Sequence, residues 1–477
     1  MKKAALDINR SDYFCAGPFF KKIFKFALPV ALAGILQLLY NTVDIIIIGQ
    51  FSDSASLAAV TSTNALVNLV VTLFTGFSIG ASAAIAQSYG AKDMEKVSRL
   101  SHTAMWLGII SGLTVGVIGV TFCRDFLYLM GSPEDVIDMS TEYLTIYFAG
   151  MPLNMVYTFG SAILRGAGDT KRPFYYMLFA GITNVGLDIW FVAKLGWNVA
   201  GVAIATVAAQ GVSAILIVIS LKRETSSLNI DAKKLRPSVN ELIEIVKLGF
   251  PAGMQGAIFA LSNVIIQSSV NTFGSPTMAG NGAAQNIESY VWTAMNSVYS
   301  AALTFTGQNY GAKKKENFNK ILFNCLLLVV IVGLSLGVSA YLLGKPLLSV
   351  YSSGADREAV VAIGRGRMMI ICTTYFICGI MDVLVGQMRG LGYSTVPMLL
   401  SIVCVCALRV LWVFTVFEKF KNLVLLYVSY PVSWTLAVIA LVVSYIIIYN
   451  KVSKKIDGEI IKPKADAAGT IRATQNQ

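Results

Sequence analysis

Two acidic residues in the first half of the chain lie inside apolar stretches, where a charge is rarely placed without a function. Asp44 lies within residues 26–49 and Asp188 within residues 174–193, and neither stretch contains Lys or Arg. An acidic side chain at the centre of a membrane helix costs roughly 2.5–3.5 kcal/mol on insertion scales. The two acids therefore indicate a pathway for an ion or a substrate.

Polar residues recur around these acids at helical spacing, as neighbours that share one helix face. The stripes are Gln37, Tyr40 and Asp44; Asn64, Asn68 and Thr72; Asn154 and Ser161; Asn184 and Asp188; and Thr206 and Gln210. Because such stripes cannot face hydrocarbon, they predict a hydrated polar chamber inside the first half. The alternative, that the Asn, Ser and Thr side chains only bond neighbouring helices together, stays open at this point.

The chemistry predicted for this chamber is ion coupling. Two nearby carboxylates in a poorly hydrated chamber repel each other, so that one binds a proton or both enclose a sodium ion. Five residues offer oxygen atoms that suit either proton binding or sodium binding: Tyr40, Asp44, Asn184, Asp188 and Thr206. Both ions therefore stay open at this point. We expect no organic cofactor. Asp44 and Asp188 are the candidate ligands if the ion is Na⁺.

The second half carries a different set of polar residues at membrane depth. The predicted span that contains Gln255 has no acidic residue. Later spans contain the charged residues Glu288, Asp382 and Arg409. We interpret Asp382 and Arg409 as a structural ion pair, with attraction of a cationic substrate by Asp382 or Glu288 as the alternative. The candidate substrate-binding residues of the whole chain are Gln37, Asn64, Asn68, Asn154, Ser161, Gln210, Gln255, Glu288 and Asp382.

Composition predicts the elements that position these residues. The chain has 477 residues, of which 55% are hydrophobic and 13% charged, about half the charged fraction of a soluble protein. Apolar runs long enough to cross a core of about 30 Å recur twelve times. An all-α polytopic membrane protein is therefore predicted, with spans near residues 26–49, 58–86, 100–122, 143–164, 174–193, 199–221, 245–270, 282–305, 321–343, 368–388, 396–417 and 423–448.

The basic residues predict the orientation of these spans. The net charge of +12 is spread over alternate loops rather than one patch, which argues against nucleic-acid binding. By the positive-inside rule, both termini are expected in the cytoplasm of a cell-membrane protein. The first span is too long for a signal peptide and is expected to be retained. The seven cysteines show no metal or disulfide spacing, and they are interpreted as apolar filler.

The chain is an internal duplication. Pro29 recurs as Pro251, Gln87 as Gln308 and Arg165 as Arg389, in the same order and at nearly equal spacing. Because each copy contains an even number of spans, the two six-helix repeats should be parallel, related by an axis along the membrane normal. The expected division is a cytoplasmic segment (1–25), an N-lobe (26–221), a cytoplasmic linker (222–244), a C-lobe (245–450) and a disordered tail (451–477).

Two short motifs recur at the predicted cytoplasmic ends of the helices. Gln87-Ser-Tyr-Gly-Ala-Lys92 matches Gln308-Asn-Tyr-Gly-Ala-Lys313, and Arg165-Gly-Ala-Gly168 matches Arg389-Gly-Leu-Gly392. Their chemistry suits helix C-termini, with Gly90 and Gly311 expected in the left-handed conformation and the basic residues near the last carbonyls. The alternative is a gate in which Arg165 and Arg389 meet when the inner side closes.

These features together resemble the multidrug and toxic compound extrusion (MATE) family over about residues 20–450. The resemblance rests on the parallel repeats, on Pro29 followed by Asp44, and on the segments Leu164-Arg-Gly-Ala-Gly-Asp-Thr170 and Met388-Arg-Gly-Leu-Gly-Tyr-Ser394. It implies an exporter of lipophilic cations driven by inward flow of H⁺ or Na⁺. In the damage-inducible-like prokaryotic branch, it implies an ion site at Tyr40, Asp44, Asn184, Asp188 and Thr206.

Other functions are weighed against this one. The nearest alternative is a flippase for lipids or lipid-linked oligosaccharides, whose anionic headgroup would favour basic residues in the chamber instead of acids. An enzyme is not expected, since the only histidine, His102, has no metal-ligand or nucleophile motif near it and is interpreted as a surface residue. A channel is disfavoured because two equivalent lobes suit rocking. The expected partners are a cationic small molecule and the bilayer, and we expect a monomer.

Overall fold

The computed structural model describes residues 12–52, 54–129, 134–351 and 357–474, and these residues form helices without any strand. A single helical turn at residues 12–14 precedes the first long helix. The helices of the first half are α2 (Phe19–Phe51), α3 (Ser54–Gly90), α4 (Met94–Leu129), α5 (Glu134–Ala149), α6 (Met151–Gly166), α7 (Lys171–Asp188), the π-helix η1 (Ile189–Lys194) and α8 (Asn198–Arg223).

The second half repeats this order after the 3₁₀ turn η2 (Ala232–Lys234). Its helices are α9 (Val239–Asn271), α10 (Ser275–Gly311), α11 (Phe318–Leu342) after the 3₁₀ turn η3 (Lys315–Asn317), α12 (Gly344–Val350), α13 (Arg357–Gly390), α14 (Thr395–Ser401), the π-helix η4 (Ile402–Ala407), α15 (Leu408–Trp412), the π-helix η5 (Val413–Phe417), α16 (Glu418–Phe420) and α17 (Leu423–Thr474). The elements α14 to α16 follow one another as a single interrupted span.

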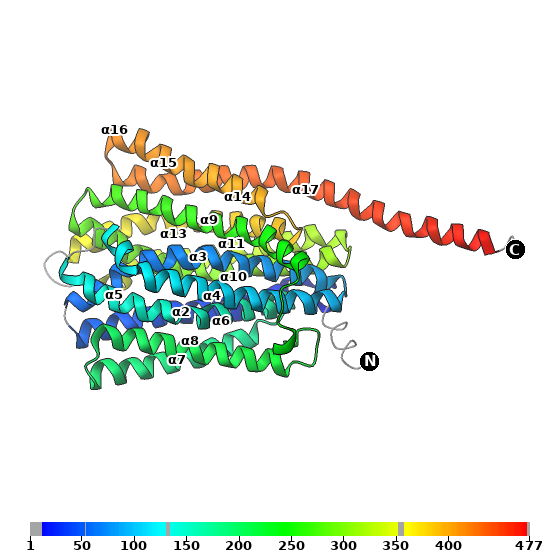
Figure 1. The fold of residues 1–477 in the computed structure, drawn as a ribbon. Helices are drawn as coiled ribbons and strands as arrows, with labels where there is room; N and C mark the ends of the chain where they lie inside the picture. The colour runs from blue at the N-terminus through cyan, green and yellow to red at the C-terminus, as the bar shows by residue number, and fades with distance from the viewer. Residues whose placement is uncertain (1–11, 53, 130–133, 352–356, 475–477) are drawn as a thin grey trace.

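The long helices lie side by side in one bundle, as Figure 1 shows. Ten of the helical segments are long and apolar enough to cross a membrane. The tandem pair α5–α6 and the more polar α10 run beside them, so the described residues contain a helical rod at each of the twelve predicted spans. The rod formed by α5 and α6 is broken at Gly150, and Pro152 opens the first turn of α6, where its missing N–H is tolerated.

The two halves have matching local geometry, as a duplication requires. The π-helix η1 begins at Ile189, directly after α7, and η5 begins at the counterpart of that residue in the second repeat, Val413. Gly168 has a φ of 91° and its counterpart Gly392 a φ of 90°. The repeats therefore share turn conformations as well as sequence motifs.

The seam between the halves is lined by glycines where α3 packs along α9. A Cβ on Gly76 would overlap the backbone of Gly253, and a Cβ on Gly80 would overlap the backbone around Gly249. Small residues let membrane helices approach closely and gain van der Waals contact. On the other side of the seam, α10 packs against α2 and α3.

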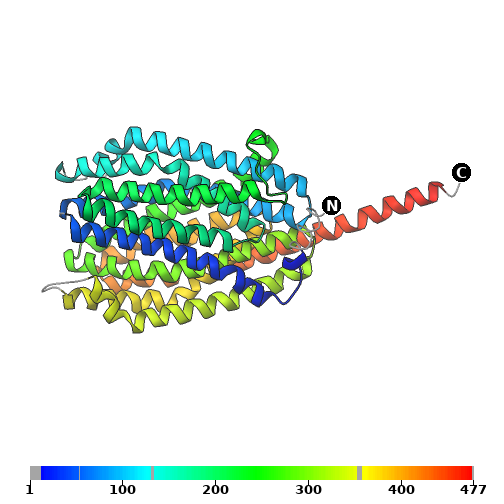
Figure 2. The ribbon, with the colours of Figure 1, turned by 90° about the horizontal axis from the view of Figure 1, so that it is seen from below.

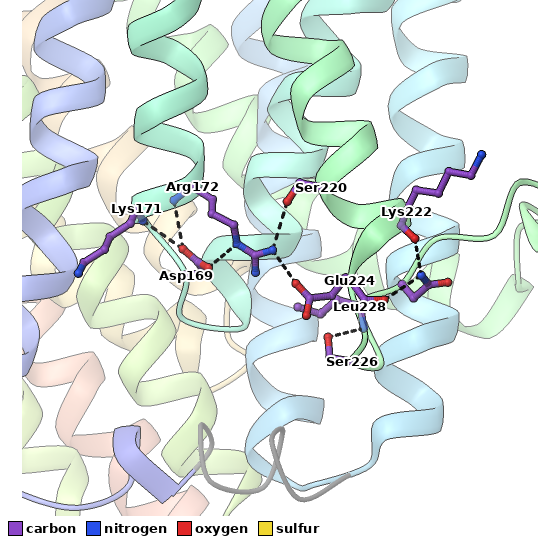
Figure 3. A network of polar contacts seen from close by, with 9 residues as sticks. Asp169, Lys171, Arg172, Ser220, Lys222, Glu224, Ser226 and Leu228 are labelled. Atoms are coloured by element: carbon purple, nitrogen blue, oxygen red, sulfur yellow. Dashed lines mark hydrogen bonds and ion pairs between the residues drawn. The ribbon is translucent and has the colours of Figure 1, made fainter. Parts of the chain in front are cut away.

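The linker between the halves is tied to the first half by a network of charges, drawn in Figure 3. Arg172 donates through Nε to Asp169 Oδ2 (2.6 Å) and through Nη1 to Glu224 Oε2 (2.5 Å) and Ser220 Oγ (3.2 Å). Asp169 and Arg172 flank the start of α7, whereas Ser220 lies at the end of α8 and Glu224 just beyond it. The network therefore anchors the point where the chain leaves the first half.

Further along, the linker lies against α4, and this contact corrects the interpretation of His102. Its side chain is only 6% exposed. Its Nε2 accepts the backbone N–H of Asp231 (3.1 Å), and its Nδ1 is 2.8 Å from the carbonyl oxygen of Ser98. His102 is thus buried beneath the linker rather than on the surface, because chain that is distant in sequence covers it. Ser238 is the N-cap residue of α9.

Both ends of the described chain emerge at the same end of the bundle, as Figures 1 and 2 show. The region predicted as a tail from residue 451 belongs to α17, which continues as a helix to Thr474 and extends past the other helices. The first turns of this extension are supported by packing: Val452 and Ile456 are buried, and Lys315 Nζ lies 2.6 Å from Asp457 Oδ1. The charged composition of this segment does not reveal these contacts, because they involve residues far away in the sequence.

Candidate functional site

The two intramembrane acids of the first half meet at the interface between α2 and α7. Asp44 is 7% exposed and Asp188, the last residue of α7, is 0% exposed. Their carboxyl groups lie close enough for a hydrogen bond if one of them carries a proton. The structure thus brings the side chains of Asp44 and Asp188 together.

Two further predicted residues complete this cluster. Thr206 of α8 donates its hydroxyl to Asp44 Oδ2 at 3.4 Å, and Asn184, one turn before Asp188, lies next to Asp44. Asn184 is 3% exposed. We refer to Asp44, Asn184, Asp188 and Thr206 as the acidic cluster.

Most polar atoms of the acidic cluster have no protein partner. Asp44 Oδ1, both carboxylate oxygens of Asp188, and both amide atoms of Asn184 are buried without a hydrogen bond. Among the described residues, no Lys or Arg lies within ion-pair distance of either acid. Because buried polar groups are nearly always satisfied in proteins, this arrangement has the chemistry of a site for a small cation or a proton.

Tyr40 takes a different place from the one expected for an ion ligand. Its hydroxyl donates to the carbonyl oxygen of Met177 at 2.6 Å, and its ring lies where a Cβ on Gly181 would stand. Met177 and Gly181 lie on α7, on the turns before Asn184. Tyr40 therefore fastens α2 to α7 beside the acidic cluster, and its oxygen can still accept a bond there.

The cluster occurs in one lobe only. The register that aligns Pro29 with Pro251 places Ile266 opposite Asp44, and the register that aligns Arg165 with Arg389 places Leu408 and Trp412 opposite Asn184 and Asp188. Ile266 is buried, and Trp412 donates its indole N–H to the carbonyl oxygen of Leu425 at 3.0 Å. The second repeat therefore has Ile266 and Trp412 at the positions of the two acids and contains no equivalent of the acidic cluster.

The remaining polar residues predicted in the first half differ in their surroundings. Gln37 and Asn68 are exposed, while Asn154 is half-buried and accepts a 3.5 Å bond from Thr158 Oγ1. Ser161 is buried with no geometric partner for its hydroxyl, and Gln210 has a buried Oε1 without one. Asn64 lies on α3, but its side chain is outside the described residues.

Glu288 has a cationic partner that the sequence interpretation missed. Arg367 Nε and Nη2 donate to its two carboxylate oxygens at 2.8 and 2.6 Å, and both side chains are 3% exposed. This partner was missed because the span was predicted to begin at residue 368, one position later, whereas α13 begins at Arg357. Glu288, predicted as a substrate-binding residue, thus has its charge balanced by Arg367 within the protein.

The predicted ion pair between Asp382 and Arg409 is wrong. Arg409 instead donates to Ser433 Oγ at 2.8 Å and lies over the ring of Tyr430, 4.0 Å from its centroid. Asp382 Oδ2 is buried without a hydrogen bond. Spans adjacent in sequence need not bring two particular side chains together, because the rotation of each helix about its axis is set by packing.

Gln255 is also engaged by a basic residue of its own lobe. Arg389 donates to Gln255 Oε1 at 2.8 Å and to the Tyr299 hydroxyl at 2.7 Å. These bonds connect α9, α10 and α13 around a buried guanidinium. Gln255 thus contributes to the internal structure of the C-lobe.

Comparison with known proteins agrees with this architecture. A family model, MatE, matches residues 29–190 and 251–415, one match in each half. The probable multidrug resistance protein YoeA of Bacillus subtilis (strain 168) is 27% identical over 434 residues, 89% of this chain and 93% of that protein. The probable multidrug resistance protein NorM of Thermotoga maritima is 26% identical over 84% of this chain and 86% of its own.

Solved structures share the fold. One, described as the outward-facing conformation of a multidrug resistance MATE family transporter of the MOP superfamily, superposes with a TM-score of 0.84 at 21% identity, covering 93% of this chain and 98% of that one. Another, a MATE protein in complex with MaL6, gives a TM-score of 0.86 over 92% of this chain and 98% of its own, at 21% identity. Because the family model matches most of the chain in two successive copies, the protein belongs to the MatE family of multi-pass membrane transporters.

Proposed function

We propose that this protein is a secondary active exporter, which moves lipophilic cationic compounds out of the cell in exchange for inward H⁺ or Na⁺. The observation that carries the proposal is the pair Asp44 and Asp188, which lie close together, buried and without a cationic partner. Several relatives bear the names of multidrug resistance or export proteins, which supports the same kind of substrate.

The acidic cluster explains why exchange is needed. Two unpaired carboxylates at membrane depth repel each other, so a cation or a proton must compensate them. An ion that binds one arrangement of the lobes more tightly than the other shifts the balance between these arrangements. In this mechanism the ion enters from outside, occupies Asp44 and Asp188, and releases the exported compound by favouring the other arrangement.

The chemistry of the chamber favours a cationic cargo over an anionic one. A flippase for lipid-linked oligosaccharides would need basic groups to hold a pyrophosphate. The buried guanidiniums of the second half are instead engaged within the protein: Arg367 by Glu288, Arg389 by Gln255 and Tyr299, and Arg409 by Ser433. We therefore place the flippase second.

The orientation follows from the basic residues. Lys21, Lys22 and Lys25 precede the first span, and Lys451, Lys454 and Lys455 follow the last, at the same end of the bundle. Positive residues near span ends are retained on the cytoplasmic side. We propose that this end, with both termini, faces the cytoplasm of a cell-membrane protein acting as a monomer.

The experiment is efflux of a fluorescent lipophilic cation from proteoliposomes, driven by a pH gradient alone and then by a Na⁺ gradient alone. One of the two gradients should drive efflux by the native protein, and Asp44→Asn and Asp188→Asn should abolish it. Glu142→Gln, which neutralises an exposed carboxylate of α5, is the matched control and should leave efflux unchanged. Full efflux by both Asn variants would remove the proposal.

A further inference from the structure

The two halves of the bundle are joined by a pair of equivalent hydrogen bonds at the end proposed to face the cytoplasm, which we call the inner end. Gln87 of the first half donates through Nε2 to the carbonyl oxygen of Gly390 in the second half, at 2.9 Å. Gln308 of the second half donates to the carbonyl oxygen of Gly166 in the first half, also at 2.9 Å. Gln87 and Gln308 are counterparts in the repeat, and so are Gly166 and Gly390.

The acceptors explain why glutamine stands at these positions. Gly166 is the last residue of α6 and Gly390 the last residue of α13. Carbonyl groups in the last turn of a helix have no partner within that helix, and both glycines are buried. Each half therefore supplies the donor that the other half lacks, and the bonds exist only while the two inner ends touch.

The backbones at this point are in direct contact. A Cβ on Gly90 would overlap the carbonyl of Gln308, and a Cβ on Gly311 would overlap the carbonyl of Gln87. The two glycines are thus needed for close approach, and the left-handed conformation expected of them belongs instead to Lys92 (φ 60°) and Lys313 (φ 57°).

The alternative gate, in which Arg165 and Arg389 meet, is not formed. Arg389 is held within its own half by Tyr299 and Gln255. The sequence motifs thus contained a contact between the lobes, but it is carried by the glutamine of one motif and the glycine carbonyl of the other.

We propose that Gln87 and Gln308 form a paired lock that keeps the inner end closed, and that both bonds must break for the lobes to open there. This inference rests on the proposed exchange between two lobe arrangements. An opened inner end lets water replace each bond, so the lock biases the equilibrium without blocking it. Its two-fold form means that each half contributes equally to the closed state.

Distances between spin labels test the lock directly. Labels at Lys171→Cys and Thr395→Cys, in a background without the native cysteines, report the separation of the lobes, since both residues are exposed counterparts at the inner ends of α7 and α14. Gln87→Ala or Gln308→Ala should raise the ratio of long to short distances about fivefold each, and the double variant roughly 25-fold if the two bonds act independently.

Gln387→Ala is the matched control. Gln387 is a buried glutamine one turn from Gly390, but it accepts from Thr306 and donates to the carbonyl of Phe318 inside its own half. It should lower thermal stability without lengthening the distances between the lobes. An unchanged distance distribution in the folded double variant would overturn the lock.

The two proposals fail in different ways. If the lock is wrong and the exporter right, the glutamine variants keep native distances while Asp44→Asn abolishes efflux. If the exporter is wrong and the lock right, the distances lengthen while no ion gradient drives efflux in the native protein. The label measurement needs no substrate, so it stands apart from the identity of the cargo.

Discussion

Arg367 and Glu288 form a two-pronged ion pair inside the second half, with Nη2 2.6 Å from Oε2 and Nε 2.8 Å from Oε1. The first half contains the opposite arrangement, in which Asp44 and Asp188 share a buried site without any base among the described residues within ion-pair distance. The second half therefore uses Glu288 for structure, while the first half leaves Asp44 and Asp188 without a cationic partner. This difference decides which residues should affect stability and which should affect transport.

Glu288→Gln should destabilise the fold strongly. It leaves the Arg367 guanidinium buried without its counter-charge, and breaking a buried ion pair at one partner typically costs about 3–5 kcal/mol. The midpoint of thermal unfolding in detergent measures this change. The double replacement Glu288→Gln with Arg367→Met should recover part of the loss, and an unchanged midpoint for the single variant would contradict a structural role.

Thr206→Val should change the affinity of Asp44 for the coupling ion without abolishing transport. The change keeps the shape of the side chain but removes the hydroxyl that donates to Asp44 Oδ2. A bond to a charged group contributes about 1.5–3 kcal/mol, and this one stabilises the ionised carboxylate. Without it Asp44 holds a proton more tightly, so in H⁺-driven efflux the proton concentration for half-maximal rate should fall roughly tenfold or more. Thr206→Ser keeps the donor and should behave nearly as the native protein, whereas equal effects from both would argue against the bond.

Arg172→Ala should loosen the linker between the halves. The change removes the bonds from Arg172 to Asp169, Ser220 and Glu224 that Figure 3 displays. Limited proteolysis should then cut residues 224–238 faster than in the native protein. Lys171→Ala is the control, because that side chain is exposed and makes no bond to Glu224 or Ser220. The same cleavage rate for both variants would show that the linker is held elsewhere.

Asn309→Ala should free the segment that precedes α2. Its Nδ2 donates to the carbonyl oxygen of Phe14 at 3.0 Å, and Asn317 Nδ2 holds the carbonyl of Cys15 at 3.1 Å. The Cys15 thiol, now 4% exposed, should react faster with a maleimide once the first bond is lost. Asn324→Ala, whose amide bonds only its own helix, should leave this rate unchanged; no difference between the two would refute the anchor.

The helical plan of the protein was predictable from local features. Apolar length alone places a helix at each of the twelve predicted spans, and the matching positions of Pro29 and Pro251 or Gln87 and Gln308 reveal the duplication. Helix ends were less predictable. Arg367 was assigned to a loop because charge marks the end of an apolar run, although its partner Glu288 makes the charge acceptable inside the bundle.

The presence of Asp44 and Asp188 inside the spans of the first half was also predictable, because it depends only on the local sequence and not on how the helices pack. The pairing of the other charges was not. Asp382 and Arg409 lie on adjacent spans, yet Arg409 turns toward Ser433 and Tyr430. Helical period tells which residues share a face but does not tell which neighbour that face meets.

The sequence by itself determined the class of protein, the order of its spans, their duplication, and the presence of two acids inside the spans of the first half, because each follows from local hydrophobicity, charge and repeated motifs. Only the tertiary structure decided which polar groups meet: Glu288 with Arg367, and Gln87 and Gln308 with the opposite lobe. Those contacts depend on how each helix is rotated and how closely the lobes approach, and both are set by packing among residues far apart in the chain.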